Sequence, residues 1–130
     1  MKKLKGILKI VFISLLALII SFNIYSFVSI KVLKHDLVKI FGYSYLEVIS
    51  GSMEPTINVG DIIIIDTKDN DYKVNDIVTF KDVNGSFVTH KIIKETEKGF
   101  ITKGDNNNTI DQDYLSKENI VGTYKFRMKY

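Results

Sequence analysis

The sequence predicts a mostly β protein: a single N-terminal transmembrane helix followed by a small, antiparallel β-rich domain. An uncharged apolar run at 10–30, short β-branched runs after residue 46 and an Asn84-Gly85 turn between two of them indicate this fold. No amphipathic helix separates these runs, which favours antiparallel pairing. We therefore expect a basic N-terminus (1–9), an anchor (10–30), a juxtamembrane amphipathic linker (31–45) and a β domain (46–130).

The apolar run at 10–30 has the length of a membrane anchor. As a helix it would extend about 31 Å, close to the hydrocarbon thickness of a bilayer. A core helix this long would dwarf the core of so small a domain. A cleaved signal peptide is disfavoured because the apolar stretch is long and Ala17 is the only alanine, so no Ala-x-Ala-like site follows. An uncleaved anchor is the best interpretation.

Lysines flank the anchor on both sides. Positions 2, 3, 5 and 9 precede it, and positions 31, 34 and 39 follow it. The greater number of lysines before the anchor favours a single-pass protein of the cell membrane, with a cytoplasmic N-terminus and an extracellular folded domain. In the linker, apolar residues at 33, 37, 40 and 41 suit one face of a helix, either lying along the bilayer interface or extending the anchor.

Five strands are expected in the β domain. Their runs are residues 62–65, 77–80, 87–93, 100–102 and 120–124, and Asn84-Gly85 joins the second to the third as a hairpin. The folded part is large enough for one modest core.

Composition excludes several kinds of function. The net charge is only +3 and the lysines are spread along the chain, so nucleic-acid binding is not expected. There is no cysteine for a thiol nucleophile, a disulfide or a zinc-thiolate site. The oxygens of residues 105–111 alternate as in a calcium loop, but Ile110 replaces the required Gly and Ser116 the bidentate Glu. We expect no metal and no cofactor.

Ser52 is the candidate nucleophile. A short apolar run leads into Ser50-Gly51-Ser52, and Pro55 then prevents easy continuation of a regular strand. This pattern favours a hydroxyl held on an irregular turn at the edge of a sheet. A serine hydroxyl is a weak nucleophile until a neighbouring base takes its proton, so the rest of the chain must supply that base.

His90 is the candidate base. Strand alternation places it on one face with Val88 and Ile92, where burial favours a neutral imidazole that can accept a proton. A core histidine bonded to a backbone carbonyl is the structural alternative. The other histidine, His35, lies among juxtamembrane lysines and is expected to be a solvated bystander. Lys91 is a rival base, but alternation directs it to the opposite face.

A third group must orient the imidazole. Three acids in the loop after residue 104 are candidates: Asp105, Asp111 and Asp113. Asp and Asn also favour loop conformations by bonding to their own backbone, so the loop pattern alone leaves the choice open.

Three segments together resemble the motifs of type I signal peptidases. They are residues 50–56 followed by Gly60-Asp61, residues 88–92, and residues 102–107, and the similarity extends over about 46–124. The histidine at position 90 resembles the archaeal and endoplasmic-reticulum branch, shared by some Gram-positive bacterial enzymes, in which it replaces a catalytic lysine.

The resemblance implies roles for particular residues. Ser52 would be the nucleophile and His90 the general base, with Asp111 as the third catalytic group. Ser50 would supply an oxyanion donor beside the Ser52 amide. Asp105 would support the site, and Lys91 falls where the serine–lysine relatives carry an arginine.

The implied activity is that of a serine endopeptidase in residues 46–130, removing signal peptides from secreted preproteins after small-x-small sites. The expected partners are preprotein substrates and the lipid bilayer, and the sequence leaves open whether a partner subunit is needed. The alternatives are a non-catalytic, membrane-anchored β module that binds extended peptides and another processing peptidase on the same scaffold.

Overall fold

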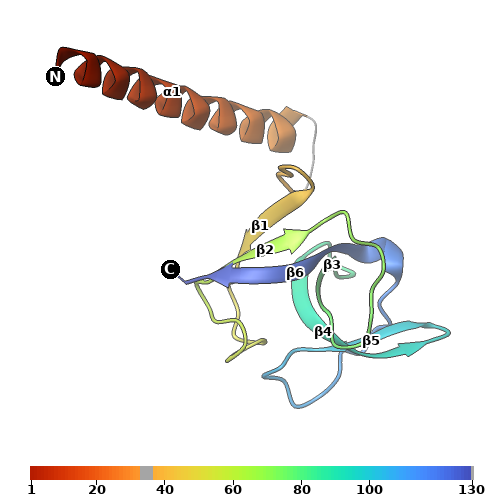
Figure 1. The fold of residues 1–130 in the computed structure, drawn as a ribbon. Helices are drawn as coiled ribbons and strands as arrows, with labels where there is room; N and C mark the ends of the chain where they lie inside the picture. Colours follow the sequence, from red (N-terminus) through yellow and green to blue (C-terminus); the bar gives the residue numbers. More distant parts are fainter. Residues whose placement is uncertain (33–36, 130) are drawn as a thin grey trace. The chain divides into compact units, whose positions relative to one another are not determined.

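Figure 1 shows the computed structural model of the protein, which describes residues 1–32 and 37–129. The chain divides into two compact units, Met1–Val38 and Lys39–Tyr130. The first unit contains α1 (Lys2–Phe27), followed directly by a short π-helical segment (Val28–Val32). His35 and Lys34, and with them part of the predicted linker, lie outside the described residues.

The helix α1 has the character expected of the anchor. None of its residues is buried. By length and composition alone, the stretch Lys2–Lys31 can cross a membrane, and it is the one such helix in the part of the chain that the structure describes. The Asn23 side-chain amide donates to the Ile19 carbonyl over 2.7 Å, so this polar group is satisfied within the helix.

The second unit is built on one antiparallel sheet of six strands in the order β1-β2-β6-β3-β4-β5. Their bounds are β1 (Tyr43–Glu47), β2 (Ile62–Asp66), β3 (Ile77–Lys81), β4 (Phe87–Thr96), β5 (Gly99–Lys103) and β6 (Ile120–Met128). The predicted fold class is confirmed, and each of the five predicted strands falls within one of β2 to β6.

The hairpin of β3 and β4 is the local frame of the site. Val78 lies opposite His90 and Thr79 opposite Thr89 in its register. Gly85 adopts φ +79° at the tip, and the Asp82 amide and carbonyl bond to Ser86 and Gly85. The Asn84-Gly85 pair thus forms the predicted turn, because Gly accepts a positive φ without steric cost.

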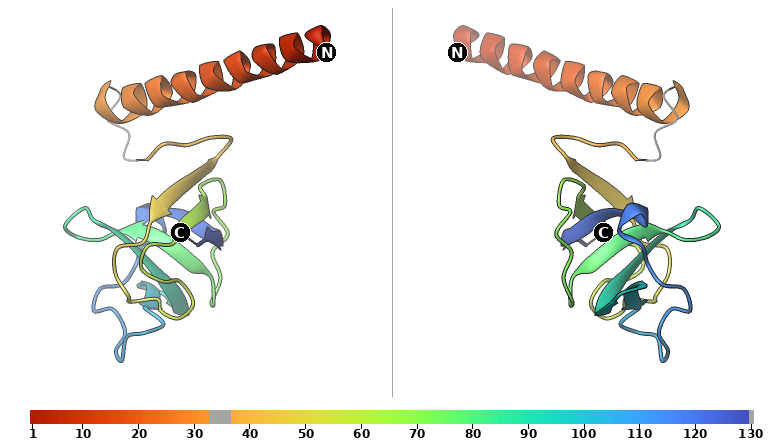
Figure 2. Two further views of the ribbon diagram at one scale, coloured as in Figure 1. Left: turned by 90° about the vertical axis from the view of Figure 1, so that its left-hand side faces the viewer. Right: turned by 90° about the vertical axis from the view of Figure 1, so that its right-hand side faces the viewer.

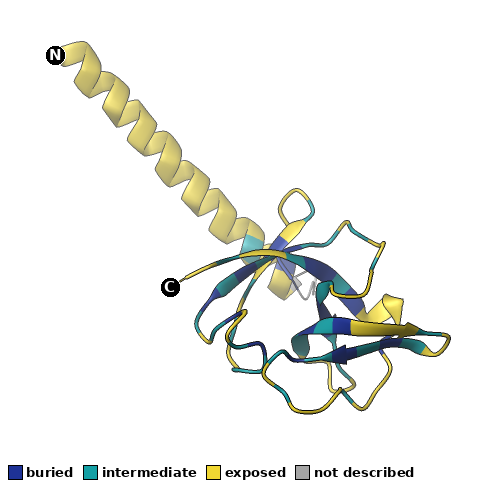
Figure 3. Cartoon of the chain, turned by 60° about the horizontal axis from the view of Figure 1, so that its bottom comes forward, coloured by how far each residue is buried: buried dark blue, intermediate teal, exposed yellow. Residues whose placement is uncertain are grey.

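The hydrophobic core covers one face of the β3-β4-β5 part of the sheet, which curls strongly (Figures 2 and 3). Its members are buried and apolar: Val78, Phe80, Ile92, Phe100, Leu115 and Ile120. His90 shares this face, since it follows Val88 and precedes Ile92 by alternation, and its ring meets the Phe80 ring edge-on at 6.3 Å between centroids. The core therefore fixes the position of the candidate base.

Two sequence expectations are wrong around the start of the domain. Residues 43–45 were expected to lie before the first strand, yet they belong to β1. In that strand Ser44 is buried while Tyr43 and Tyr45 point outward, the inverse of the usual alternation of apolar-in and polar-out. The expected amphipathic helix does not extend through residues 37–42 either, because Ile40 and Tyr43 form a β-bridge across a tight turn.

A partly buried ion pair joins β6 to the residue that precedes β2. Arg127 of β6 donates to Asp61 over 2.6 Å, and the same carboxylate oxygen accepts from the Asn58 amide over 2.9 Å. The Asn58 amide and then the Arg127 guanidinium lower the pKa of Asp61 below its usual range. Since Asp61 stands just before β2, this pair fastens the preceding loop to the last strand.

Replacing Arg127 with Met is expected to lower the midpoint of thermal unfolding by several degrees, because it leaves the buried Asp61 carboxylate without its cation. Scanning calorimetry of the detergent-solubilised protein would measure this shift. The Asp61→Asn, Arg127→Met double variant should recover part of the loss. A single variant as stable as the wild type would contradict a structural role for the pair.

Candidate active site

The nucleophile candidate lies on a loop that is closed at its base. The Val48 amide donates to the Asp61 carbonyl over 2.9 Å, and the Gly60 amide donates to the Val48 carbonyl over 2.8 Å. These bonds continue the β1-β2 pairing beyond Glu47 and hold residues 49–60 as one loop. Inside it, Met53 and Ile57 are buried, so the loop has its own apolar anchor against the sheet.

Ser52 and His90 are hydrogen-bonded. The distance from Ser52 Oγ to His90 Nε2 is 3.1 Å, although the two residues lie 38 positions apart in the sequence. His90 is buried, and Ser52 is half-buried. A hydroxyl within hydrogen-bond distance of an imidazole nitrogen is the arrangement that an activated serine requires.

Asp111 completes the line on the other side of the imidazole. Its Oδ2 lies 2.6 Å from His90 Nδ1. A carboxylate only accepts hydrogen bonds, so Nδ1 carries the proton and Nε2 is left free to accept one from Ser52. Of the three acids that the sequence offered, Asp111 is the one bonded to His90, while Asp113 is exposed.

Thr102 of β5 also forms a hydrogen bond with the Asp111 carboxylate. Its hydroxyl donates to Asp111 Oδ2 over 2.6 Å, and the Asp111 amide donates to the Thr102 carbonyl over 2.8 Å. Thr102 is fully buried. Sequence reasoning assigned no role to this residue. Its position two residues after the apolar Phe100 was a signal of burial, and a buried hydroxyl needs a hydrogen-bond partner.

The loop after β5 packs directly on the nucleophile loop. The Asn106 amide donates to the Ser52 carbonyl over 2.8 Å, and the Asn106 side chain donates to the Gly51 carbonyl over 3.0 Å. A Cβ atom on Gly104 would come within 2.5 Å of the Ser52 carbonyl oxygen. Only glycine permits this approach, which explains its place in the Gly104-Asp105-Asn106 motif.

Asp105 joins three segments around the site instead of orienting the histidine. Its carboxylate accepts from the Thr56 hydroxyl over 2.6 Å and pairs with Lys91 Nζ at 3.2 Å, and its amide contacts the Met53 sulfur. Partial burial raises the pKa of Asp105, but the Thr56 hydroxyl and the Lys91 ammonium lower it by more. The net effect is a pKa below the usual range. Lys91 is thus engaged with Asp105, on the face opposite His90.

The remaining predicted site residue, Ser50, lies beside the nucleophile. The Ser50 and Ser52 hydroxyl oxygens are 3.5 Å apart, and Ser50 is exposed to solvent. The structure therefore brings four of the predicted site residues together, Ser50, Ser52, His90 and Asp111, while Asp105 bonds to the neighbouring Thr56 and Lys91. In addition to Thr102, sequence reasoning assigned no role to Thr56 or Asn106, whose contacts are between distant loops.

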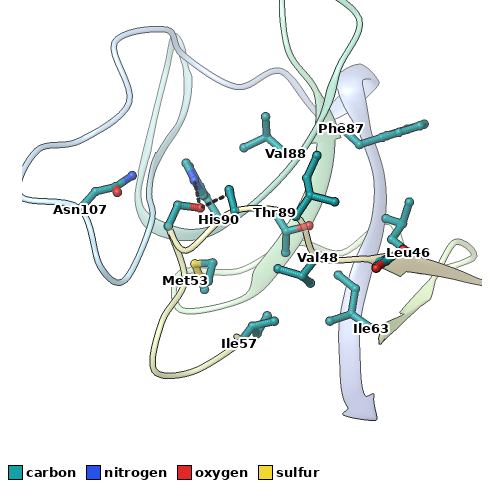
Figure 4. Close-up of a pocket in the computed structure, with 14 residues that line it drawn as sticks. Leu46, Val48, Met53, Ile57, Ile63, Phe87, Val88, Thr89, His90 and Asn107 are labelled. Atoms are coloured by element: carbon teal, nitrogen blue, oxygen red, sulfur yellow. Dashed lines mark hydrogen bonds between the residues drawn. The ribbon is translucent and has the colours of Figure 1, made fainter. Parts of the chain in front are cut away.

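A pocket of about 290 Å³ opens in front of Ser52 (Figure 4). Most of its walls are apolar side chains from the β1 end, the nucleophile loop, β2 and β4: Leu46, Val48, Ile49, Met53, Ile57, Ile63, Phe87 and Val88. A second hollow of about 420 Å³ lies on the Asp111 side of His90. Among the described residues, no group of three or more His, Cys, Asp or Glu side chains is placed to hold a metal ion.

A small antiparallel β domain with a hydrogen-bonded Ser-His-Asp line beside an apolar pocket defines the class of serine peptidases. Comparison with known proteins agrees. The Peptidase S24-like family matches residues 27–124. The chain belongs to this family, and its relatives confirm the resemblance to type I signal peptidases.

The curated relatives are named as signal peptidases. Signal peptidase I W of Bacillus subtilis is 38% identical over 91 residues, which cover 65% of this chain and 48% of the relative. The signal peptidase complex catalytic subunit SEC11 of Candida tropicalis is 38% identical over 91 residues, which cover 60% of this chain and 55% of the relative. The chain spans about half the length of these relatives.

Thr102→Val is expected to reduce kcat about 10- to 100-fold with little change in KM, because one hydrogen bond to the Asp111 carboxylate is lost in a site of unchanged shape. Thr102→Ser keeps the hydroxyl and should retain most of the activity. Steady-state cleavage assays over a range of pH would measure this. Equal activity of the Val and Ser variants would contradict a positioning role.

Asp105→Asn is expected to destabilise the protein by about 1 kcal/mol near neutral pH, because the charge-assisted bonds to Lys91 and Thr56 weaken. The folded-state pKa of Asp105 is lowered, so its contribution is complete above the unfolded-state pKa and disappears as the pH falls through the folded-state value. Urea unfolding at several pH values should show wild type and variant converging in acid. A difference that grows in acid would contradict this linkage.

Proposed function

We propose that this chain is a membrane-anchored signal peptidase, a serine endopeptidase that uses Ser52, His90 and Asp111 to remove signal peptides from preproteins. The observation that carries the proposal is the continuous line of hydrogen bonds from Ser52 Oγ through the His90 imidazole to Asp111. The names of the relatives support the substrate class. Neither the fold nor the comparisons favour the non-catalytic alternative.

In the proposed reaction, Ser52 Oγ attacks the scissile carbonyl carbon while its proton passes to His90 Nε2. Asp111 stabilises the resulting imidazolium through Nδ1–H. When the tetrahedral intermediate collapses, His90 gives its proton to the departing amine, and an acyl-enzyme on Ser52 remains. A water molecule, deprotonated by His90, then hydrolyses the ester and restores Ser52.

The oxyanion of the intermediate requires donors beside Ser52. The Ser52 amide and the Ser50 hydroxyl are the proposed pair, because the Ser50 oxygen lies only 3.5 Å from the nucleophilic oxygen. The Ser52 N–H shares its peptide plane with the Gly51 carbonyl, which accepts from the Asn106 side-chain amide over 3.0 Å. That bond limits rotation of this plane, which favours an amide donor that is positioned before the substrate binds.

The apolar pocket in front of Ser52 supports substrates that are extended peptides with small side chains near the cut. Its walls include residues 46–50, which follow on from β1, and residues 87–90 of the strand β4. An extended substrate can bond to such backbone edges while its alternate side chains enter the pocket. The preference for small side chains at the first and third positions before the cut is what the resemblance to type I signal peptidases implies, and a pocket of about 290 Å³ has room for them.

The proposed topology follows the lysine distribution: residues 1–9 are cytoplasmic, 10–30 span the cell membrane, a linker follows, and the β domain, which begins with β1 at Tyr43, is the extracellular catalytic domain. The anchor would hold the site where tethered preproteins emerge, which raises their effective concentration. The SEC11 relatives are named as subunits of a complex, which makes a partner subunit a proposal to test for this chain as well.

The first test is cleavage of a preprotein that carries a small-x-small site by the full chain in detergent. Ser52→Ala and His90→Ala should each lower kcat at least about 10³-fold, because they remove the nucleophile and the base. Asp111→Asn should lower kcat about 10²- to 10⁴-fold, since the imidazole then loses its correct tautomer.

Lys91→Ala is the matched control, because Lys91 adjoins His90 but bonds to Asp105. Losing one ion pair should cost less than about tenfold in activity. A greater loss in Lys91→Ala than in His90→Ala would overturn the assignment of the base. If the wild type fails to cleave and a fluorophosphonate probe does not label Ser52, the peptidase proposal is wrong for this chain alone.

A further inference from the structure

A tight turn with an exposed phenylalanine at its tip precedes β1. Ile40 and Tyr43 exchange two backbone hydrogen bonds of 2.8 and 2.9 Å around Phe41 and Gly42. Both central residues have positive φ, 51° for Phe41 and 81° for Gly42. Such two-residue turns favour Asn-Gly or Gly-Gly, because a side chain at positive φ is strained. Phe41 is therefore an unfavourable residue for this backbone.

Residues that follow β2 hold the turn in this conformation through hydrogen bonds. The Thr67 amide and hydroxyl both donate to the Gly42 carbonyl, over 2.8 and 2.7 Å. Lys68 Nζ donates to the Phe41 carbonyl over 3.2 Å. The backbone is thus fixed by the start of the β2-β3 connection, and the strain at Phe41 persists because its surroundings determine it.

Nothing in the domain compensates this strain through packing of the side chain. Phe41 is 93% exposed, the highest value for a large apolar residue in the unit Lys39–Tyr130. Strained residues with an exposed apolar side chain are candidates for contact with something outside the fold. The tip of the turn is therefore a candidate interaction surface.

The surroundings of the tip have the composition of a membrane interface. Ile40, Tyr43 and Tyr45 are also exposed on the turn and the outward face of β1. Lys68 Nζ lies 3.9 Å from the centroid of the Tyr43 ring, so a cation accompanies the aromatic groups. Aromatic rings together with lysines are enriched where proteins meet lipid headgroups.

The covalent chain limits how far the tip can lie from a bilayer. The helical segments end at Val32, nine residues before Phe41. Even fully extended, nine residues span only about 32 Å. If α1 crosses the membrane, as proposed above, the tip is tethered within reach of the headgroup layer. A lipid surface is therefore the occupant that the tether and the chemistry both favour.

We infer that the Ile40–Tyr43 turn is a second membrane contact, which inserts Phe41 into the lipid interface and fixes the catalytic unit against the bilayer. The helix would supply attachment, and the turn would supply orientation. Because Thr67 and Lys68 lock the turn to the sheet, insertion of Phe41 would restrain the whole domain.

The test uses tryptophan as a depth probe, because the chain contains no tryptophan of its own. Three full-chain variants are reconstituted in phosphatidylcholine and phosphatidylglycerol vesicles: Phe41→Trp, Leu16→Trp in the middle of α1, and Val83→Trp at the tip of the β3-β4 hairpin. Val83 is the matched control, as an apolar residue that is 84% exposed. Quenching by lipids brominated near the headgroup or near the chain end is measured.

We expect the Phe41→Trp variant to be quenched at least twofold more strongly by shallow bromines than the Val83→Trp variant, and the Leu16→Trp variant most strongly by deep bromines. Quenching of Phe41→Trp equal to that of Val83→Trp, with Leu16→Trp quenched, would overturn the turn proposal and leave the anchor intact. No quenching in Leu16→Trp would overturn the anchor. Emission of Phe41→Trp that shifts to the blue in detergent with rising protein concentration would identify a second copy as the occupant.

Phe41→Asn separates a lipid role from a structural role. Asn tolerates positive φ, so the variant should unfold at the same temperature or a few degrees higher. Labelling of the domain face beside the turn by a lipid-phase photoreactive probe should nevertheless fall severalfold. A lower unfolding temperature with unchanged labelling would show that Phe41 serves the fold, and would overturn the proposal.

Discussion

The carbonyl oxygen of Ser52 accepts the amide hydrogen of Asn106, and the absence of a side chain at Gly104 permits this contact. Through this single close approach, the loop after β5 fixes the loop after β1. The distance between Ser52 and His90 depends on it, because it fixes the Ser52 backbone to the loop that also carries Asp111. Loss of this contact would let the Ser52 hydroxyl move away from the His90 imidazole.

The same loop serves the other side of the imidazole. After passing Ser52, the chain returns to β5, where Asp111 exchanges bonds with both the backbone and the hydroxyl of Thr102. Gly104, at one end of the segment 104–111, lies against Ser52, and Asp111, at the other end, bonds to His90. Asp105 adds the ion pair with Lys91 and the bond to Thr56. The two loops that carry the site are held to the strands and to each other by these hydrogen bonds, which suits a mechanism that depends on preset geometry.

Local patterns predicted most of the fold. The β3-β4 hairpin followed from Asn84-Gly85, and the helix followed from an uninterrupted apolar run, because both depend on neighbours in sequence. The prediction failed at β1, where Ser44 is buried and the tyrosines face outward. Alternation of apolar and polar residues indicates a strand, but it does not show which face of that strand is covered by the rest of the protein. If the exposed face of β1 contacts lipid, as we infer from Phe41, its inverted pattern has a physical reason.

For the site, the sequence by itself determined the chemical types available: one serine on an irregular turn, one histidine on an apolar strand face, and three acids in one loop. The loop pattern did not determine which acid bonds to the histidine, because Asp105, Asp111 and Asp113 are all compatible with a loop, and only the family resemblance pointed to Asp111. Tertiary structure shows the pairing, since two hydrogen bonds to Thr102 of β5 hold Asp111 at 2.6 Å from the imidazole, while Asp105 pairs with Lys91. It also showed the contact of Thr102. A hydroxyl buried in the sheet needs a hydrogen-bond partner, and here that partner is Asp111, nine residues away in the sequence.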